Sequence, residues 1–151
     1  MNPTFTKHTH HKHVRRKPGV PMTIKKTHDI IPSLAEDSIR IIPLGGVEEI
    51  GRNMTVIEFR EDIIVCDAGI KFTDDDTPGI DYILPNIKYL EERKNKIRAI
   101  VITHGHLDHI GAIPYIIDRL GNPPIYTREF GALMIQKRQV EFPHLPSLCL
   151  S

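Results

Sequence analysis

The stretch that decides the fold is AIVITHGHLDHIGAIPYIID, which runs from Ala99 to Asp118. It opens with Ala99–Thr103, an apolar and β-branched run that predicts a buried strand. Four side chains that can bind a metal follow within six positions: His104, His106, Asp108 and His109. Isoleucines at helical spacing then predict a helix to about Leu120. The segment His104–His109, called the metal loop below, therefore lies at the carboxyl end of a strand, where open α/β sheets place their chemistry.

Imidazole and carboxylate groups, as in this loop, are the ligands of zinc and similar first-row ions. His104 and His106 are two residues apart, so both can reach one ion from an extended loop. Asp108 and His109 are adjacent and open the helix in another direction, so they can serve a second ion. Two neighbouring ions can clamp a phosphoryl or carbonyl centre and convert bound water to hydroxide. A polar loop with solvated histidines is the alternative, which this density of ligands disfavours.

The loop carries a resemblance, because HGHLDH at His104–His109 matches the HxHxDH signature of the metallo-β-lactamase superfamily. Three other segments, in this order, resemble the N-terminal part of the ribonuclease J family, over about Ile39 to Phe142. These segments are LGGVEEIGRNM at Leu44–Met54, DAG at Asp67–Gly69 and TPGIDYILP at Thr77–Pro85. Glu48 departs from the family pattern, which usually has Gly there, and this puts the local turn in question.

The resemblance implies an α/β fold, the metallo-β-lactamase-like αββα sandwich, of which this chain would be only the N-terminal part. It implies a metal-dependent hydrolase of RNA phosphodiesters, acting as a 5′-3′ exonuclease and endonuclease in RNA processing and decay. Two zinc ions are the expected cofactors of the complete enzyme, with Mn or Mg as alternatives. RNA is the expected partner, and homo-oligomerisation of the complete enzyme is left open.

The resemblance also assigns roles to individual side chains. His104 and His106 would hold one ion, while Asp108 and His109 would hold the other and act as the catalytic residues. Asp108 is expected in addition to orient the attacking hydroxide. In the family the Asp that matches Asp67 supports the metal loop, and such a carboxylate can fix the tautomer of a ligand imidazole. An Asp that only caps a turn at the end of a strand is an equal alternative.

The motif supplies about two ligands for each ion, whereas zinc usually takes three or four. In the resembling family the remaining ligands, a His, a bridging Asp and a late His, come from segments downstream of the matched region. His144 is the only His after His109, and its proline-flanked setting does not favour it as a ligand. The expected protein is therefore the first part of a longer enzyme, which would be inactive by itself.

Two other functions remain open. A superfamily hydrolase that acts on a thioester or a lactam would share the metal loop, but the segments at 44–53 and 77–85 disfavour it. A non-catalytic fragment that serves as an interaction module for a partner chain is favoured by the missing ligands.

Composition and charge set limits on these functions. The 151 residues are 40% hydrophobic and 26% charged, and the net charge of +1 does not by itself indicate a nucleic-acid partner. No apolar run is long enough to span a bilayer, and no secretory signal is present, so a cytoplasmic location without a membrane partner is expected. Cys66 lies in an apolar run and is expected to be a buried, reduced thiol.

Two parts of the chain are expected. Residues 1–37 are a basic, His-rich and disordered tail, for which solvation is favoured over binding of RNA phosphates. Residues 38–151 are the N-terminal part of a metallo-β-lactamase domain. Strands are predicted at 39–44, 54–59, 63–67, 99–103 and 125–127, and helices at 87–94, from the metal loop to about 120, and at 128–140.

Overall fold

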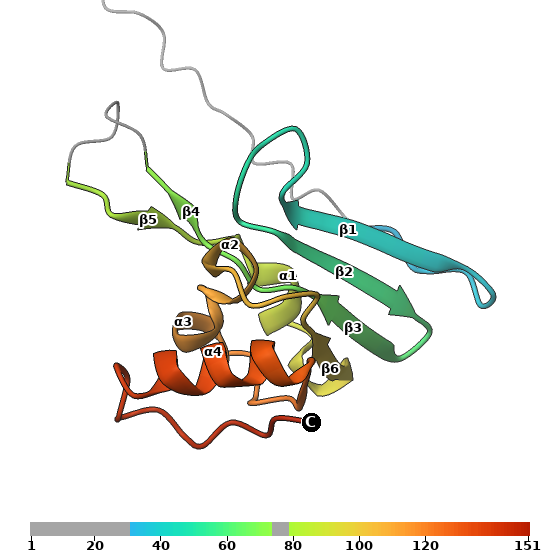
Figure 1. The fold of residues 1–151 in the computed structure, drawn as a ribbon. Helices are drawn as coiled ribbons and strands as arrows, with labels where there is room; N and C mark the ends of the chain where they lie inside the picture. Colours follow the sequence, from blue (N-terminus) through green and yellow to red (C-terminus); the bar gives the residue numbers. More distant parts are fainter. Residues whose placement is uncertain (1–30, 74–78) are drawn as a thin grey trace, which may run out of the picture. The chain divides into compact units, whose positions relative to one another are not determined.

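The computed structural model describes residues 31–73 and 79–151 (Figure 1). The prediction for residues 1–30 of the tail lies outside the described residues. Ser33–Ser151 form one compact unit, whose first strand begins at Ile39.

A five-stranded mixed sheet in the order β1-β2-β3-β6-β7 forms the centre of this unit. β1 runs antiparallel to β2 and β2 to β3, whereas β3, β6 and β7 are parallel neighbours. The carboxyl ends of β3 and β6 therefore meet at one edge, together with the amino end of β2. The strands are β1 Ile39–Gly45, β2 Met54–Phe59, β3 Asp62–Cys66, β6 Ile97–Val101 and β7 Ile125–Tyr126.

The five predicted strands are confirmed to within two residues. The prediction of one continuous helix after the metal loop is wrong. The helix is divided into α2 Leu107–Ile110 and α3 Ile113–Ile116. Pro114 has no N–H to donate to the carbonyl of Ile110, so the helical ladder is interrupted there. The predicted helix at 128–140 is confirmed as α4 Glu129–Gln139.

Two further features lie before β6. The predicted helix at 87–94 is shorter, with α1 at Lys88–Glu91 and a 3₁₀ turn at Lys94–Lys96. β4 Lys71–Phe72 and β5 Tyr82–Ile83 form a small antiparallel sheet that was not predicted. Among the described helices, none is long and apolar enough to cross a membrane.

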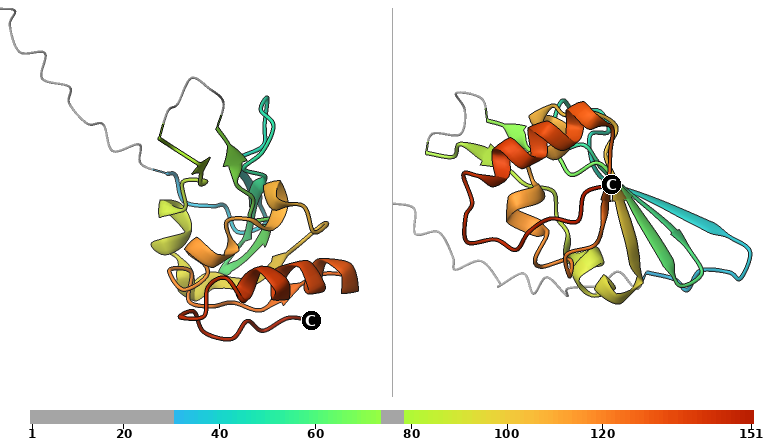
Figure 2. Two further views of the ribbon diagram at one scale, coloured as in Figure 1. Left: turned by 60° about the vertical axis from the view of Figure 1, so that its left-hand side comes forward. Right: turned by 60° about the horizontal axis from the view of Figure 1, so that its bottom comes forward.

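The helices cover one face of the central sheet, and the core lies between them (Figures 1 and 2). Val56 of β2 and Val65 of β3 are buried there against isoleucines of α2 and α3. The other face is apolar as well, but among the described residues nothing covers it fully: Ile41 is 66% exposed and its neighbour across β2, Ile64, is 40% exposed. Cys66 also lies on this face and is half-buried rather than buried as predicted.

Candidate metal centre

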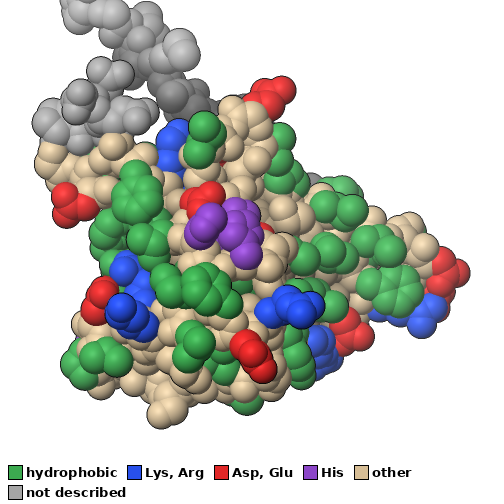
Figure 3. Space-filling view, viewed as in Figure 1, with side chains coloured by type: hydrophobic (Ala, Val, Ile, Leu, Met, Phe, Trp, Pro, Cys, Tyr) green, Lys and Arg blue, Asp and Glu red, His purple; other side chains and the backbone are tan. Residues whose placement is uncertain are grey.

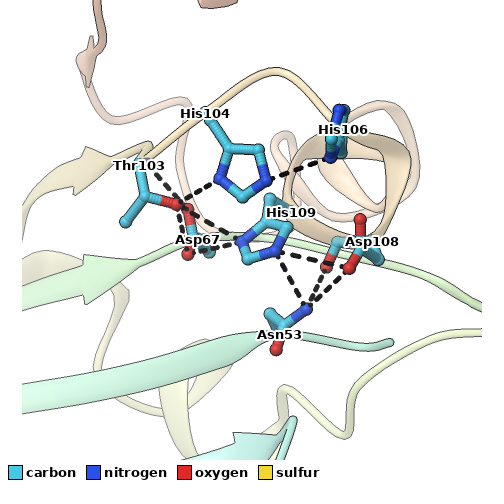
Figure 4. Close-up of polar contacts among 7 residues, drawn as sticks. All are labelled: Asn53, Asp67, Thr103, His104, His106, Asp108 and His109. Carbon is cyan, nitrogen blue, oxygen red and sulfur yellow. Dashed lines mark hydrogen bonds and ion pairs between the residues drawn. The ribbon is translucent and has the colours of Figure 1, made fainter. Parts of the chain in front are cut away.

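The predicted ligands gather at the sheet edge where β3 and β6 end and β2 begins (Figure 4). The loop after β6 carries His104 and His106, and α2 carries Asp108 and His109. Asp67 directly follows β3, which is the parallel neighbour of β6. Parallel pairing thus brings Asp67 beside a loop that lies about forty residues later in the chain. The histidines lie at the surface of the molecule, next to acidic side chains (Figure 3).

The donor atoms of the loop form two pairs. His104 Nε2 lies 3.2 Å from His106 Nδ1, and Asp108 Oδ2 lies 3.3 Å from His109 Nε2. Two ligands of one tetrahedral zinc ion, each bonded at about 2.0–2.1 Å, are separated by about 3.3 Å. Each pair therefore has the spacing of two ligands of a single ion, and the donor chemistry suits a divalent metal.

Each ion would receive only two ligands from this loop. In the described part of the chain, no group of three or more His, Cys, Asp or Glu side chains is arranged to hold an ion. His144 packs at a ring-centroid distance of 6.3 Å from Phe142, which in turn contacts Tyr115 of α3. His144 is thus part of an aromatic cluster outside the network shown in Figure 4.

Asp67 is buried, with 7% of its surface exposed, and both oxygens of its carboxylate are in hydrogen-bond contact with donors. Oδ1 accepts hydrogen bonds from the backbone N–H of Thr103 at 2.8 Å and from its hydroxyl at 3.0 Å. Oδ2 lies 2.8 Å from His109 Nδ1. A carboxylate accepts only, so the His109 proton is held on Nδ1 and the Nε2 lone pair faces the metal loop. This contact is the one predicted for Asp67, whose role as a support of a metal ligand remains a proposal.

The segment after Asp67 is bonded to the metal loop along its backbone. Ala68 N–H donates to the carbonyl of His109 at 2.7 Å, and Ile70 N–H donates to that of Leu107 at 3.1 Å. A Cβ on Gly69 would lie 1.5 Å from the carbonyl oxygen of Asp108, so only glycine allows this approach. The DAG segment at Asp67–Gly69 therefore forms a close-fitting support for the loop.

Thr103 and Asn53 belong to the same network, although neither was predicted as a site residue. The Thr103 hydroxyl lies 3.1 Å from His104 Nδ1 and also contacts Asp67. Asn53 Nδ2 lies 3.1 Å from Asp108 Oδ2 and 3.2 Å from His109 Nε2. Asn53 closes the LGGVEEIGRN segment, where a lone amide at the end of a glycine-rich motif was the available signal.

Two open hollows flank the metal loop. One, of about 700 Å³, is lined by Thr103, His104 and the beginning of α4 at Glu129. The other, of about 540 Å³, lies beside Asp108 and is lined mainly by apolar side chains, including Ile50 and Phe72. An extended ligand that reaches the loop therefore has room on both sides of it.

Comparison with known proteins finds named relatives of this chain. The chain is 46% identical over 99 residues to a ribonuclease J of Mycoplasma pneumoniae, covering 66% of this chain and 17% of that protein. It is 46% identical over 94 residues to the ribonuclease J of Thermus thermophilus, covering 62% and 16%. The chain thus spans about a sixth of the length of these relatives, whose names confirm the predicted resemblance.

Solved structures and family models give two further matches. Human tRNase Z, short form, has a TM-score of 0.46 and 18% identity, covering 73% of this chain and 42% of that chain. The model of the metallo-beta-lactamase superfamily matches residues 47–147, which is more than half of the chain. The fold is therefore the predicted α/β metallo-β-lactamase fold, and the chain belongs to the metallo-beta-lactamase superfamily.

Proposed function

We propose that the loop from His104 to His109 binds two divalent ions and serves the hydrolysis of RNA phosphodiester bonds. One observation carries the proposal: two pairs of donor atoms, 3.2 Å and 3.3 Å apart, lie side by side at an open sheet edge. The superfamily implies binding of a divalent metal, and the relatives with 46% identity are named ribonuclease J. RNA is the proposed substrate for that reason, and the cytoplasm remains the proposed location.

In this proposal each side chain has a defined task. His104 Nε2 and His106 Nδ1 hold one ion, while Asp108 and His109 Nε2 hold the other, with zinc as the first choice and Mn or Mg as alternatives. When bound, the ions supply Lewis acidity toward a phosphodiester and lower the pKa of water. Asp108 keeps a partly exposed carboxylate that can accept a hydrogen bond from water and orient it. Asp67 keeps the His109 proton on Nδ1.

A chimera tests the proposal in a complete enzyme. The matching segment of the Mycoplasma pneumoniae ribonuclease J is replaced by this chain's sequence, and cleavage of a 5′-monophosphorylated RNA is followed with zinc or manganese. We expect metal-dependent cleavage, its loss in the His104→Ala chimera, and its retention in a Thr55→Ala control on β2. A chimera that cleaves RNA equally well with His104→Ala would contradict the proposal. Hydrolysis of a thioester in place of RNA would favour the other superfamily hydrolase.

The uncovered sheet face favours a second candidate, an interaction module that binds a partner chain. Ile39 and Ile41 of β1 and Phe59 of β2 are exposed on that face. Native mass spectrometry of the purified chain would detect a stable complex. A complex that survives in the His104→Ala variant would assign binding to this surface rather than to the metal loop.

A further inference from the structure

We propose that Asn53 is a positioning residue of the metal centre, whose side-chain amide holds Asp108 and His109 at the separation that one ion requires. The inference rests on the proposed metal site and adds to it a residue from β2's amino end, 55 positions before Asp108. Asn53 would not bind the ion itself. It would act through two side chains that do.

The contacts of Asn53 converge on α2. Its Nδ2 lies 3.0 Å from the carbonyl oxygen of Asp108, 3.1 Å from Asp108 Oδ2 and 3.2 Å from His109 Nε2. The Asn53 backbone N–H donates to the same Asp108 carbonyl at 3.1 Å, and its own carbonyl accepts from Gly69 at 3.0 Å. The backbone and the side chain of Asn53 therefore both hold Asp108. The bond from Gly69 also connects Asn53 to the Asp67–Gly69 segment that supports the metal loop.

The chemistry of the Asp108–His109 pair explains why a donor is needed there. Asp67 holds the His109 proton on Nδ1, so Nε2 presents a lone pair toward the Asp108 carboxylate 3.3 Å away. Both groups accept hydrogen bonds, and without a donor or a cation between them they repel each other. The His104–His106 pair differs, because one neutral imidazole can donate to the other across their 3.2 Å contact. The Asn53 amide supplies this donor while no ion is bound. An ion would take the Nε2 lone pair of His109, and the amide would keep its contacts to the carbonyl and carboxylate of Asp108.

The loop before Asn53 is shaped to deliver this amide. A Cβ on Gly46 would lie 2.4 Å from Asn53 Oδ1, and Gly46 has a φ of 83°, so glycine is required beside the side chain. Arg52 pairs with Glu49 through both carboxylate oxygens, at 2.8 Å and 2.9 Å, and this closes the loop. The backbone N–H of Arg52 donates to the carbonyl of Ile70 at 2.9 Å, and this bond anchors the loop next to Asn53.

The first test uses the full chain without metal. Asn53→Leu keeps a similar side-chain volume but removes the donor, Asn53→Ala removes both, and Thr55→Ala, two residues later, is the matched control. Long-range ¹H–¹⁵N spectra of the histidine rings are recorded at the same pH for all variants. We expect the His109 Nε2 signal to move in both Asn53 variants while His104 and His106 keep theirs. An unchanged His109 signal in Asn53→Leu, with thermal melting showing it folded, would overturn the proposal.

The second test measures metal binding by Co²⁺ titration of the same variants, followed by the visible d–d absorption. Loss of a partner that orients a metal ligand weakens metal affinity about 10–100-fold, and we expect this loss for one of two bound ions in Asn53→Ala and Asn53→Leu. Thr55→Ala should bind like wild type. Wild-type affinity and an unaltered Co²⁺ spectrum in both Asn53 variants would overturn the positioning role. A wild-type chain that binds no Co²⁺ would contradict the proposed function, and the ring-nitrogen spectra would then decide the role of Asn53 independently.

Discussion

Glu48 adopts a left-handed backbone conformation, with a φ of 56°, at the position where the resembling family usually has Gly. This conformation costs an L-residue about 1–2 kcal/mol, whereas glycine adopts it freely but loses more chain entropy on folding. We expect Glu48→Gly to raise the free energy of unfolding by up to about 1 kcal/mol in chemical denaturation. Glu48→Ala is the control, since it removes the exposed carboxylate and keeps the strain. Equal stability of the two variants would show that the left-handed backbone is not costly here.

Asp67 has four hydrogen-bond contacts to Thr103 and His109. Its Oδ2 atom is the one that contacts His109 Nδ1, so a change at this atom alters a proposed metal ligand. Asp67→Asn keeps the shape but places an amide where His109 Nδ1–H needs an acceptor. We expect zinc affinity, measured by isothermal titration calorimetry, to fall about 10–100-fold. Asp62→Asn, at the exposed beginning of the same strand, should bind zinc like wild type. Unchanged affinity in Asp67→Asn would leave Asp67 as a turn cap only.

At the scale of elements, a buried polar cluster holds α1 against β1 and β2. Glu58 of β2 is 3% exposed and accepts hydrogen bonds from the Tyr89 hydroxyl and from Arg40 of β1 at 2.9 Å. Arg93 stacks over the Tyr89 ring at 4.0 Å. A buried carboxylate that loses a donor leaves an unsatisfied charged group, so this cluster fixes how α1 packs.

Tyr89→Phe removes the donor to Glu58 and keeps the ring. We expect the free energy of unfolding to fall by about 1–3 kcal/mol, because Glu58 then loses one of its buried partners. Tyr126→Phe, at an exposed position of β7, is the matched control and should change little. If both variants were as stable as wild type in urea denaturation, α1 would be held by apolar packing alone.

The same cluster predicts a dependence on alkaline pH. Burial, and then the hydrogen bond to Glu58, raise the pKa of Tyr89 above its ordinary value of 10.0. The folded chain therefore keeps the phenol proton at a pH where the unfolded chain loses it, so stability is retained below about pH 10 and declines as pH rises through the folded pKa. Urea denaturation between about pH 9 and pH 12 should show a steeper decline for wild type than for Tyr89→Phe. Parallel curves would contradict this assignment.

At the scale of the whole molecule, the uncovered face of the central sheet predicts self-association. Large exposed apolar patches mark interaction or aggregation sites, and burying an Ile contributes about 1.5–3 kcal/mol. We expect the purified chain to associate in analytical ultracentrifugation and Ile41→Lys to weaken the association more than about tenfold. Val47→Lys changes an equally exposed side chain in the loop before β2, away from this face, and should have no effect. Association that is insensitive to Ile41→Lys would assign the contact to another surface.

The ligand count predicts the behaviour of the chain by itself. The two donor pairs supply two ligands to each ion, and zinc usually takes three or four, so affinity is lost and water is poorly held. We expect weak zinc binding and no cleavage of a 5′-monophosphorylated RNA by the purified chain. Metal-dependent cleavage that disappears in His104→Ala would contradict this and would mean that further ligands complete the site in the isolated chain.

The sequence by itself determined the local part of the centre. A strand, a loop rich in candidate ligands and a helix start can be recognised from residues close together in the chain, so His104, His106, Asp108 and His109 were predicted as ligands without coordinates. The hydrophobic runs likewise predicted the five strands, because alternation and β-branching depend on the residues of each strand alone. The superfamily followed from the same short motifs.

Tertiary structure decided the contacts between distant segments. Asn53 reaches Asp108 across 55 positions only because β2 begins at the edge where β3 and β6 end. Strand order and direction set that meeting point, and no local pattern encodes them. The division between α2 and α3 has a tertiary cause beside the local one at Pro114, since the Ala112 N–H donates to the distant carbonyl of Ala68 at 2.8 Å. Residue types near one another in the chain thus specified the candidate ligands, and the packing of the sheet specified which distant residues contact them.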